Sequence, residues 1–331
     1  MTPRLNSSPQ DMPDDESGGA DTKSILSITK AAEDSLDAVV LNQFEFIFLW
    51  FILKSNLQVE YLINANAAGA DINAKDKYGM TSLHHCAIRG NHRVLQKLLR
   101  TPGIIKEPTD ISGSTPLHLA CTYNQIRIAK ILITEGDANL RALDSDLRTP
   151  LHEACQEGNK EIAHLLLKKA DEMFGSEFIR KMTSDKDDDG ATPLLLGVGK
   201  GGTDIVKLLL DYKADPNQYN KEFNFPVHSA ARTGDLETLE LLLEHNARID
   251  CTNIMSETPL FLAAENNNLE VIEFLMDHGA NLDRYNINVV SPIMAAAIEG
   301  HADVVDLLIS KGTVLENTPH NIAFYNVTSK N

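Results

Sequence analysis

Four histidines are the first residues in this sequence that could do chemistry, because imidazole is a common zinc ligand. They are His84, His118, His152 and His228, and they lie far apart along the chain. A zinc site needs several ligands gathered tightly, and no tight ligand cluster accompanies these histidines. We therefore do not expect a metal site.

The stretch from Asp185 to Gly190, DKDDDG, copies the start of a calcium-binding loop. Such a loop needs a bidentate glutamate at its twelfth position, which is Leu196 here. Pro193 would also begin a helix inside the loop, because proline favours the first helical position. We expect an ordinary turn instead of a calcium site.

Gly197 to Gly202, GVGKGG, superficially resembles a phosphate-binding loop. It follows no strand and lacks the G-x-x-x-x-G-K-[ST] pattern, so we expect no nucleotide there. No nucleophile, base and orienting group appear at a known catalytic spacing. We expect neither an enzyme nor a cofactor.

The four cysteines do not have the spacing of a disulfide framework or a metal site. Cys121 and Cys155 occupy the same slot beside a small residue, and Cys86 falls one position earlier in its own segment. We interpret these three as buried free thiols in a reducing compartment. We expect Cys251 to be exposed.

One unit of the chain, Asp110 to Asn139, indicates the turn and the helices on which these histidines and cysteines lie. Ser112-Gly113 predicts a turn, because glycine tolerates a positive φ. Thr115 suits a helix N-cap and Pro116 the first helical position. A second helix follows Asn124, with apolar residues at helical spacing, and we expect Gly136 to end it in a left-handed conformation.

The same unit recurs along the chain. Its threonine slot is occupied successively by Thr81, Thr115, Thr149, Thr192, Phe225, Thr258 and Ser291, in steps of 33 or 34 residues except for one of 43. A period near 33 residues with T-P-L-H-x-A resembles the ankyrin-repeat family across roughly residues 57–313. The resemblance implies an all-α solenoid of stacked helix pairs with β-hairpin-like fingers. It also implies that the slot histidine hydrogen-bonds locally and ties neighbouring turns together.

The repeats suggest a division of the chain into four parts. Residues 1–23 are an acidic tail expected to be disordered, and 24–74 an irregular N-terminal cap or partial repeat. Residues 75–313 form the array of seven registered copies, and 314–331 an irregular C-terminal tail. No basic start followed by an apolar core appears, which argues against a signal peptide and for a cytoplasmic protein.

The aromatic run 44–53 does not fit the repeat, and four interpretations stay open. It could be an irregular cap packed on the first full repeat, or a segment that docks on a membrane surface or a partner. A membrane span is the third interpretation, although the run is about half as long as the 20 or so apolar residues that a span needs. An artefact of gene prediction is the fourth alternative.

Several copies depart from the repeat chemistry. Leu147 stands where the turn glycine is expected, so that turn could be strained. An added segment near 172–184 carries Phe174, Phe178, Ile179 and Met182 in an amphipathic pattern that should lengthen its helical pair. Later copies replace the slot histidine by Leu195, Phe261 and Met294.

The formal charge of −17 and the pI near 5.0 argue against nucleic acid as a partner, since phosphate contacts need clustered lysine and arginine. By resemblance to the family, finger tips and the ends of first helices form a concave face that contacts protein partners. The candidate partner-binding residues at the matching positions are Lys77, Tyr78, Met80, Ile88, Arg89, Ile111, Ser112, Ser114, Thr122, Tyr123, Lys221, Glu222, Asn224, Arg232, Ile254, Met255, Glu257, Ile287, Asn288 and Val290.

The function that these patterns favour is a non-catalytic interaction scaffold. An alternative comes from DKDDDGATPLLLGVGKGG, which is similar to a segment in transient receptor potential channels of the ankyrin type. That resemblance implies the cytosolic regulatory array of a cation channel, with membrane association only as part of the channel. A substrate adaptor for a ubiquitin ligase is a third hypothesis, but no convincing recruiting motif supports it.

Overall fold

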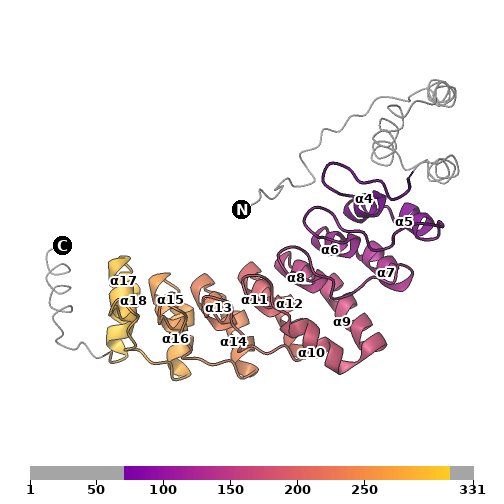
Figure 1. Ribbon diagram of the computed structural model, residues 1–331. Helices are drawn as coiled ribbons and strands as arrows, with labels where there is room; N and C mark the ends of the chain where they lie inside the picture. Colours follow the sequence, from indigo (N-terminus) through magenta and orange to yellow (C-terminus); the bar gives the residue numbers. More distant parts are fainter. Residues whose placement is uncertain (1–70, 314–331) are drawn as a thin grey trace, which may run out of the picture.

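The computed structural model describes residues 71–313, which form seven helix pairs and one added helix (Figure 1). No β-strand occurs among these residues, which confirms the all-α prediction for this part of the chain. The expectations for residues 1–23, for the aromatic run 44–53 and for the tail 314–331 lie outside the described residues, as does most of 24–74. The division of the chain into four parts therefore stays a prediction.

Each repeat contributes a first helix and a second helix that pack against one another. The first helices are α4 (Ser82–Arg89), α6 (Pro116–Thr122), α8 (Pro150–Gln156), α11 (Pro193–Lys200), α13 (Pro226–Thr233), α15 (Pro259–Glu265) and α17 (Pro292–Ile298). The second helices are α5 (His92–Leu99), α7 (Ile126–Thr134), α9 (Lys160–Phe174), α12 (Thr203–Asp211), α14 (Leu236–Glu244), α16 (Leu269–Asp277) and α18 (Ala302–Ser310).

The threonine slot is the N-cap of every first helix. Thr258 illustrates the arrangement, because its hydroxyl accepts a hydrogen bond from the N–H of Phe261 at 3.1 Å. Proline occupies the first helical position in six of the seven first helices, where its missing N–H has no cost. Phe225 has the same extended N-cap backbone but offers no hydroxyl. The register read from the sequence therefore fixes where each first helix begins.

Small residues in the first helices let neighbouring repeats stack closely. In α6, Leu117, Ala120 and Cys121 are buried, and α6 packs between α4 and α8. In α7, Ile128 and Leu132 are buried between α5 and α9. Each fully buried leucine or isoleucine stabilises the fold by about 2 kcal/mol relative to an exposed one. The core is therefore one continuous ribbon along the array.

Three of the thiols belong to this ribbon. Cys86, Cys121 and Cys155 are free and buried, as predicted. Burial raises the pKa of the Cys86 thiol to about 12 and raises the pKa of the other two well above the usual range for a thiol. Because the thiolate is the reactive form, these residues serve as small core residues and not as nucleophiles.

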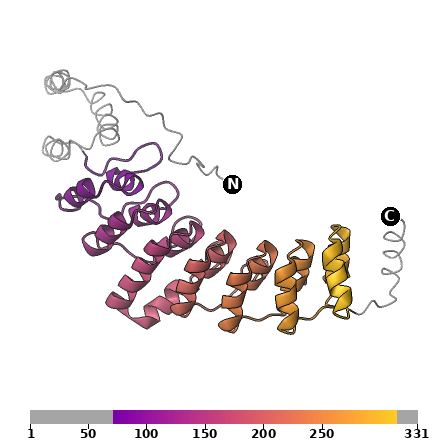
Figure 2. The same cartoon turned by 180° about the vertical axis from the view of Figure 1, so that it is seen from behind.

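The stacked pairs form an arc. The first helices lie along its inner side and the second helices along its outer side (Figures 1 and 2). The inner side is therefore a concave face to which every described repeat contributes.

The added segment is more elaborate than a lengthened helical pair. α9 does run on to Phe174, but it ends at Gly175, whose φ of +77° breaks the helix. A separate helix, α10 (Ser176–Ser184), then packs back on α9. Ile179 and Met182 are buried, whereas Phe174 stays exposed. The break falls at the one residue of the segment that tolerates this backbone without strain.

The predicted left-handed end at Gly136 is wrong. The residue with positive φ is the next one, Asp137, at +57°. Gly136 is required for a different reason, because a Cβ at this position would lie 2.6 Å from the carbonyl oxygen of Leu132. Close approach of the backbone, and not handedness, selects glycine here.

A candidate protein-binding face

The loop that precedes each first helix forms a finger with a closed turn. In the second finger, the Asp110 carboxylate accepts hydrogen bonds from the N–H groups of Ser112 and Ser114 at 2.8 and 2.9 Å. The Asp110 N–H donates to the carbonyl of Ser114 at 3.1 Å and closes the turn. The equivalent side chains of Asp76, Asp144, Asn220, Asn253 and Asn286 accept from the same two positions.

Neighbouring fingers are joined by one backbone hydrogen bond each. The N–H of Ile111 donates to the carbonyl of Tyr78 at 3.0 Å, and this pattern repeats at every described junction. The other bonds run from Ser145 to Ser112, Asp188 to Asp146, Lys221 to Asp189, Ile254 to Glu222 and Ile287 to Met255, at 2.8 to 3.0 Å. The tips therefore form a fixed row along the described array.

In the four repeats that have it, the slot histidine connects its own first helix to the next finger, as the family resemblance implied. In His118, Nδ1 accepts from the N–H of Thr115 at 3.1 Å, while Nε2 donates to the carbonyl of Arg148 at 3.0 Å. His84, His152 and His228 make the corresponding bonds to Ser114, Ala191 and Glu257. These histidines are structural ties between repeats.

Burial lowers the pKa of all four imidazoles and outweighs the carbonyl hydrogen bonds and nearby carboxylates that raise it. The pKa of His228 falls to about 4. A neutral ring with its hydrogen on Nε2 matches the observed pattern, in which Nδ1 accepts and Nε2 donates.

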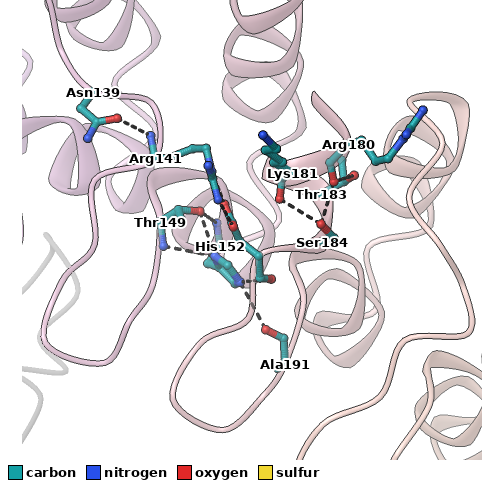
Figure 3. A network of polar contacts seen from close by, with 10 residues as sticks. Asn139, Arg141, Thr149, His152, Arg180, Lys181, Thr183, Ser184 and Ala191 are labelled. Carbon is teal, nitrogen blue, oxygen red and sulfur yellow. Dashed lines mark hydrogen bonds and ion pairs between the residues drawn. The ribbon is translucent and has the colours of Figure 1, made fainter. Parts of the chain in front are cut away.

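The acidic stretch DKDDDG forms the fourth finger and is engaged with its surroundings. The Arg141 guanidinium donates two hydrogen bonds to the Asp185 carboxylate, at 2.7 Å from Nε and 2.5 Å from Nη2 (Figure 3). His152 Nε2 also lies 3.1 Å from the Asp185 carbonyl. Asp187 is buried, and its carboxylate accepts from the N–H of Ala191 at 2.7 Å. These contacts tie α10 and the fourth finger to the preceding repeat.

Leu147 does occupy a left-handed turn position, with φ of +58°. Gly79, Gly113 and Gly190 fill this position in the first, second and fourth fingers. Three other fingers also have a non-glycine residue there, namely Phe223, Ser256 and Val289, at +58° to +60°. A side chain costs about 1–2 kcal/mol in this conformation, so these turns are strained.

None of the twenty candidate partner-binding residues is buried. Most are exposed, including Tyr78, Ile111, Tyr123, Ile254 and Ile287. The half-buried ones are Met80, Ile88, Ser114, Thr122, Asn224, Glu257 and Val290. The ladder of finger bonds holds the tip residues in one row, while Tyr123 and Arg232 lie at the ends of first helices.

Comparison with known proteins decides the family. A family model described as ankyrin repeats in three copies matches residues 104–176, 148–220, 173–253 and 227–319. A second, described as ankyrin repeats in many copies, matches residues 54–99. The chain belongs to the ankyrin-repeat family.

Individual relatives match parts of this ankyrin array. The human SMC5-SMC6 complex localization factor protein 1 is 38% identical over 82 residues, which are 24% of this chain and 8% of that protein. The human transient receptor potential cation channel subfamily A member 1 is 31% identical over 157 residues, which are 47% of this chain and 13% of that protein. The chain thus spans only a small part of the length of either relative.

Among solved structures, the ankyrin repeat domain of Bcl-3, titled a unique member of the IkappaB protein family, is similar to this array. The match has a TM-score of 0.59 and 25% sequence identity, and it covers 70% of this chain and all of that domain. An ankyrin array is typically a protein-interaction module. Within residues 71–313, no helix has the length and apolar character needed to cross a membrane.

Two features of the ankyrin array were missed in the sequence. Ile298, at the end of α17, is 64% exposed and occupies the helix position that Ile88 and Thr122 have in earlier repeats. Tyr219 and Phe223 stack on the fifth finger, with ring centroids 5.0 Å apart. The replacement of the turn glycine by phenylalanine was the signal that could have revealed the second feature.

The expectation that Cys251 is exposed is wrong. Its side chain is half-buried, and its thiol lies 3.3 Å from the Arg248 carbonyl and 3.9 Å from His228 Nδ1. Burial raises the pKa of Cys251 to about 12. The physical reason is that Cys251 packs against the hydrophobic core beside His228.

Proposed function

We propose that this chain is a non-catalytic scaffold that binds a protein partner through its concave face. The observation that carries the proposal is the row of finger tips, in which exposed apolar side chains stand on turns fixed by backbone hydrogen bonds. Tyr78, Ile111, Ile254 and Ile287 are such side chains. Anchors held in place before binding lose little conformational entropy when a partner arrives.

The proposed face also has chemistry suited to specificity. Glu257, Glu265 and Glu299 belong to the last two repeats, near the exposed Ile298. Burial, together with the charges of Glu257 and Glu299, raises the pKa of the Glu265 carboxyl. A partner with apolar and basic side chains would relieve this repulsion.

Replacing Tyr78, Met80 and Tyr123 together with alanine is expected to abolish recovery of the partner. Aromatic anchors carry a large share of the free energy of most interfaces, and loss of three contacts should weaken binding at least about 100-fold, about 3 kcal/mol. The measurement is affinity isolation from cell lysate with the tagged full chain, followed by mass spectrometry of what wild type and variant retain.

A matched control is replacement of Met173 and Phe174 with alanine, since both side chains are 53% exposed and belong to the outer helix α9. This control should recover the partner normally, and both variants should keep the circular dichroism of the wild type. Equal recovery by the concave-face variant and the wild type would argue against the proposed face.

The alternative function is a cytosolic regulatory array of a transient receptor potential channel of the ankyrin type. The specific observation in its favour is the 31% identity to the human channel over 157 residues. Free, buried Cys86, Cys121 and Cys155 suit a cytoplasmic location under either proposal.

Long-read sequencing of the transcripts separates the two proposals. The channel proposal expects membrane-spanning segments encoded in frame after Asn331. Transcripts that all carry a stop codon there would contradict it for this product and leave the scaffold proposal standing.

A further inference from the structure

A pocket of about 460 Å³ lies between the fifth and sixth fingers. One wall is aromatic and consists of Tyr219, Phe223 and Phe225. The opposite wall comes from the segment 248–252, which leads into the sixth finger. We refer to this cavity as the finger-flank pocket.

The aromatic wall presents ring surface to solvent. The Tyr219 and Phe223 rings stack with an interplanar angle of 18°, and Tyr219 also contacts Phe225 at 5.1 Å between centroids. Phe225 is buried, whereas Tyr219 and Phe223 are 39% and 44% exposed. The wall therefore has a buried base and an accessible outer surface on which a further aromatic ring can stack.

The backbone conformation of Phe223 is unfavourable for a residue with a side chain. It occupies the left-handed turn position with φ of +59°, where glycine is unstrained and a bulky side chain is not. Its side chain is only partly buried, at 44% exposed. Residues held in such unfavourable conformations often contact ligands, and this position faces a pocket.

One basic side chain lines the finger-flank pocket and two more lie close to its lining residues, in a chain whose net charge is −17. Arg248 lines the pocket. Arg284 donates to the carbonyl of Asp250 at 3.4 Å, and its positive charge acts against burial, which raises the pKa of Cys251 in the pocket wall. The Lys186 ammonium lies 4.9 Å from the Tyr219 ring centroid and donates to the Tyr219 carbonyl at 2.7 Å. Within residues 71–313, none of these three cations forms an ion pair of 4.0 Å or less with a carboxylate.

The one acidic group in the wall is already engaged, because the Asp250 carboxylate accepts a hydrogen bond from the N–H of Asn281 at 3.0 Å. At Cys251 its single negative charge is opposed by the two positive charges of Arg248 and Arg284. The charges nearest Cys251 are therefore positive on balance, in a chain whose net charge is negative.

We propose that the finger-flank pocket binds an acidic peptide segment of a partner protein. An aromatic side chain of that segment stacks against Tyr219 and Phe223, and flanking carboxylates pair with Arg248 and Lys186. This site lies beside the candidate concave-face residues Glu222 and Asn224, and it adds the flank of the fifth finger to the surface that we propose for binding.

The test is selection of a random peptide display library on the immobilised full chain, with prior removal of peptides that bind the Phe223→Gly variant. The selected peptides are expected to contain an aromatic residue flanked by aspartate or glutamate. Phe223→Gly and Arg248→Glu should each weaken a selected peptide about tenfold or more in fluorescence anisotropy.

Phe223→Gly restores the residue that the turn prefers, so loss of binding by this variant cannot be attributed to unfolding. Leu147→Gly is its matched control, because it relieves the same strain at the same position of the third finger. Leu147→Gly and the Tyr78→Ala/Tyr123→Ala pair should bind the peptides within about twofold of wild type. That result would show that peptide binding at the pocket does not depend on the aromatic anchors of the first two repeats.

Three results would overturn the proposal: no enrichment, enrichment of basic peptides, or peptides whose affinity is unchanged in Arg248→Glu. Each leaves the proposed concave face untouched, since that face is tested with different variants.

Discussion

Replacing His118 with alanine is expected to lower the free energy of unfolding by about 2–4 kcal/mol. The imidazole is buried and joins two repeats through the N–H of Thr115 and the carbonyl of Arg148. Its loss leaves the Thr115 N–H without its acceptor and opens a cavity. Urea unfolding followed by circular dichroism at a pH of about 7.5, where the imidazole is neutral, measures the change.

His164 provides the control for this experiment, because it is exposed on the outer helix α9. His164→Ala should change the free energy of unfolding by less than about 0.5 kcal/mol. If His118→Ala were as stable as His164→Ala, the hydrogen bonds that join the repeats would contribute nothing to stability.

Acid is expected to destabilise the array well above the pH at which ordinary carboxylates titrate. Burial lowers the pKa of His84, His118, His152 and His228 in the folded chain, whereas the unfolded chain binds protons near pH 6.5. Between these values the unfolded state holds more protons, so stability falls as pH falls.

The effect of His228 alone is roughly 3 kcal/mol by about pH 4, because its pKa in the folded chain is about 4. Asp187 and Glu265 oppose the loss, since burial raises the pKa of both carboxyls and the folded state then takes up protons first. Urea unfolding between about pH 7 and about pH 5 best isolates the histidine contribution, because most carboxylates stay ionised there.

A His228→Leu variant sharpens the pH measurement, because Leu195 shows that leucine fits this slot in the fourth repeat. The free energy of unfolding of this variant should fall less steeply with falling pH than that of the wild type. The two slopes should differ by close to the value for one proton, about 1.4 kcal/mol per pH unit. An identical slope in variant and wild type would mean that His228 binds as many protons in the folded chain as in the unfolded chain, so that burial does not lower its pKa.

The repeat register could be predicted from the sequence because it rests on local chemistry. Threonine, proline and small residues recur at fixed positions, and each has a local preference for a cap, a first turn or a close helix contact. Even Phe225 and Ser291 kept their place as N-caps, although the consensus residue was lost. The repeat period therefore predicts where a first helix begins even when the consensus residue is absent.

The errors arose where a contact, and not a local preference, decides the environment of a residue. Glycine after a helix suggests a left-handed end, but Gly136 is selected by the nearby Leu132 carbonyl. A cysteine in a loop suggests exposure, but Cys251 packs against the hydrophobic core and lies beside His228 of the preceding first helix. Contacts between neighbouring repeats cannot be read from the local pattern of either one.

The added helix illustrates a third limit. The amphipathic pattern of the segment predicted helix correctly, but it did not show that the chain breaks at Gly175 and packs back on α9. The Arg141–Asp185 pair that fixes α10 joins residues of different repeats, and the two side chains have no shared motif. Which exposed residues bind a partner also stays a prediction, because exposure permits binding without requiring it.

Site-specific photo-crosslinking shows whether the concave face contacts a protein partner. Benzoylphenylalanine would replace Tyr123, at the inner end of α6, or Phe174, on the outer helix α9. We expect position 123 to crosslink to one defined partner in cells and position 174 not to do so. Crosslinking of the same partner from position 174 but not from position 123 would contradict the proposed function.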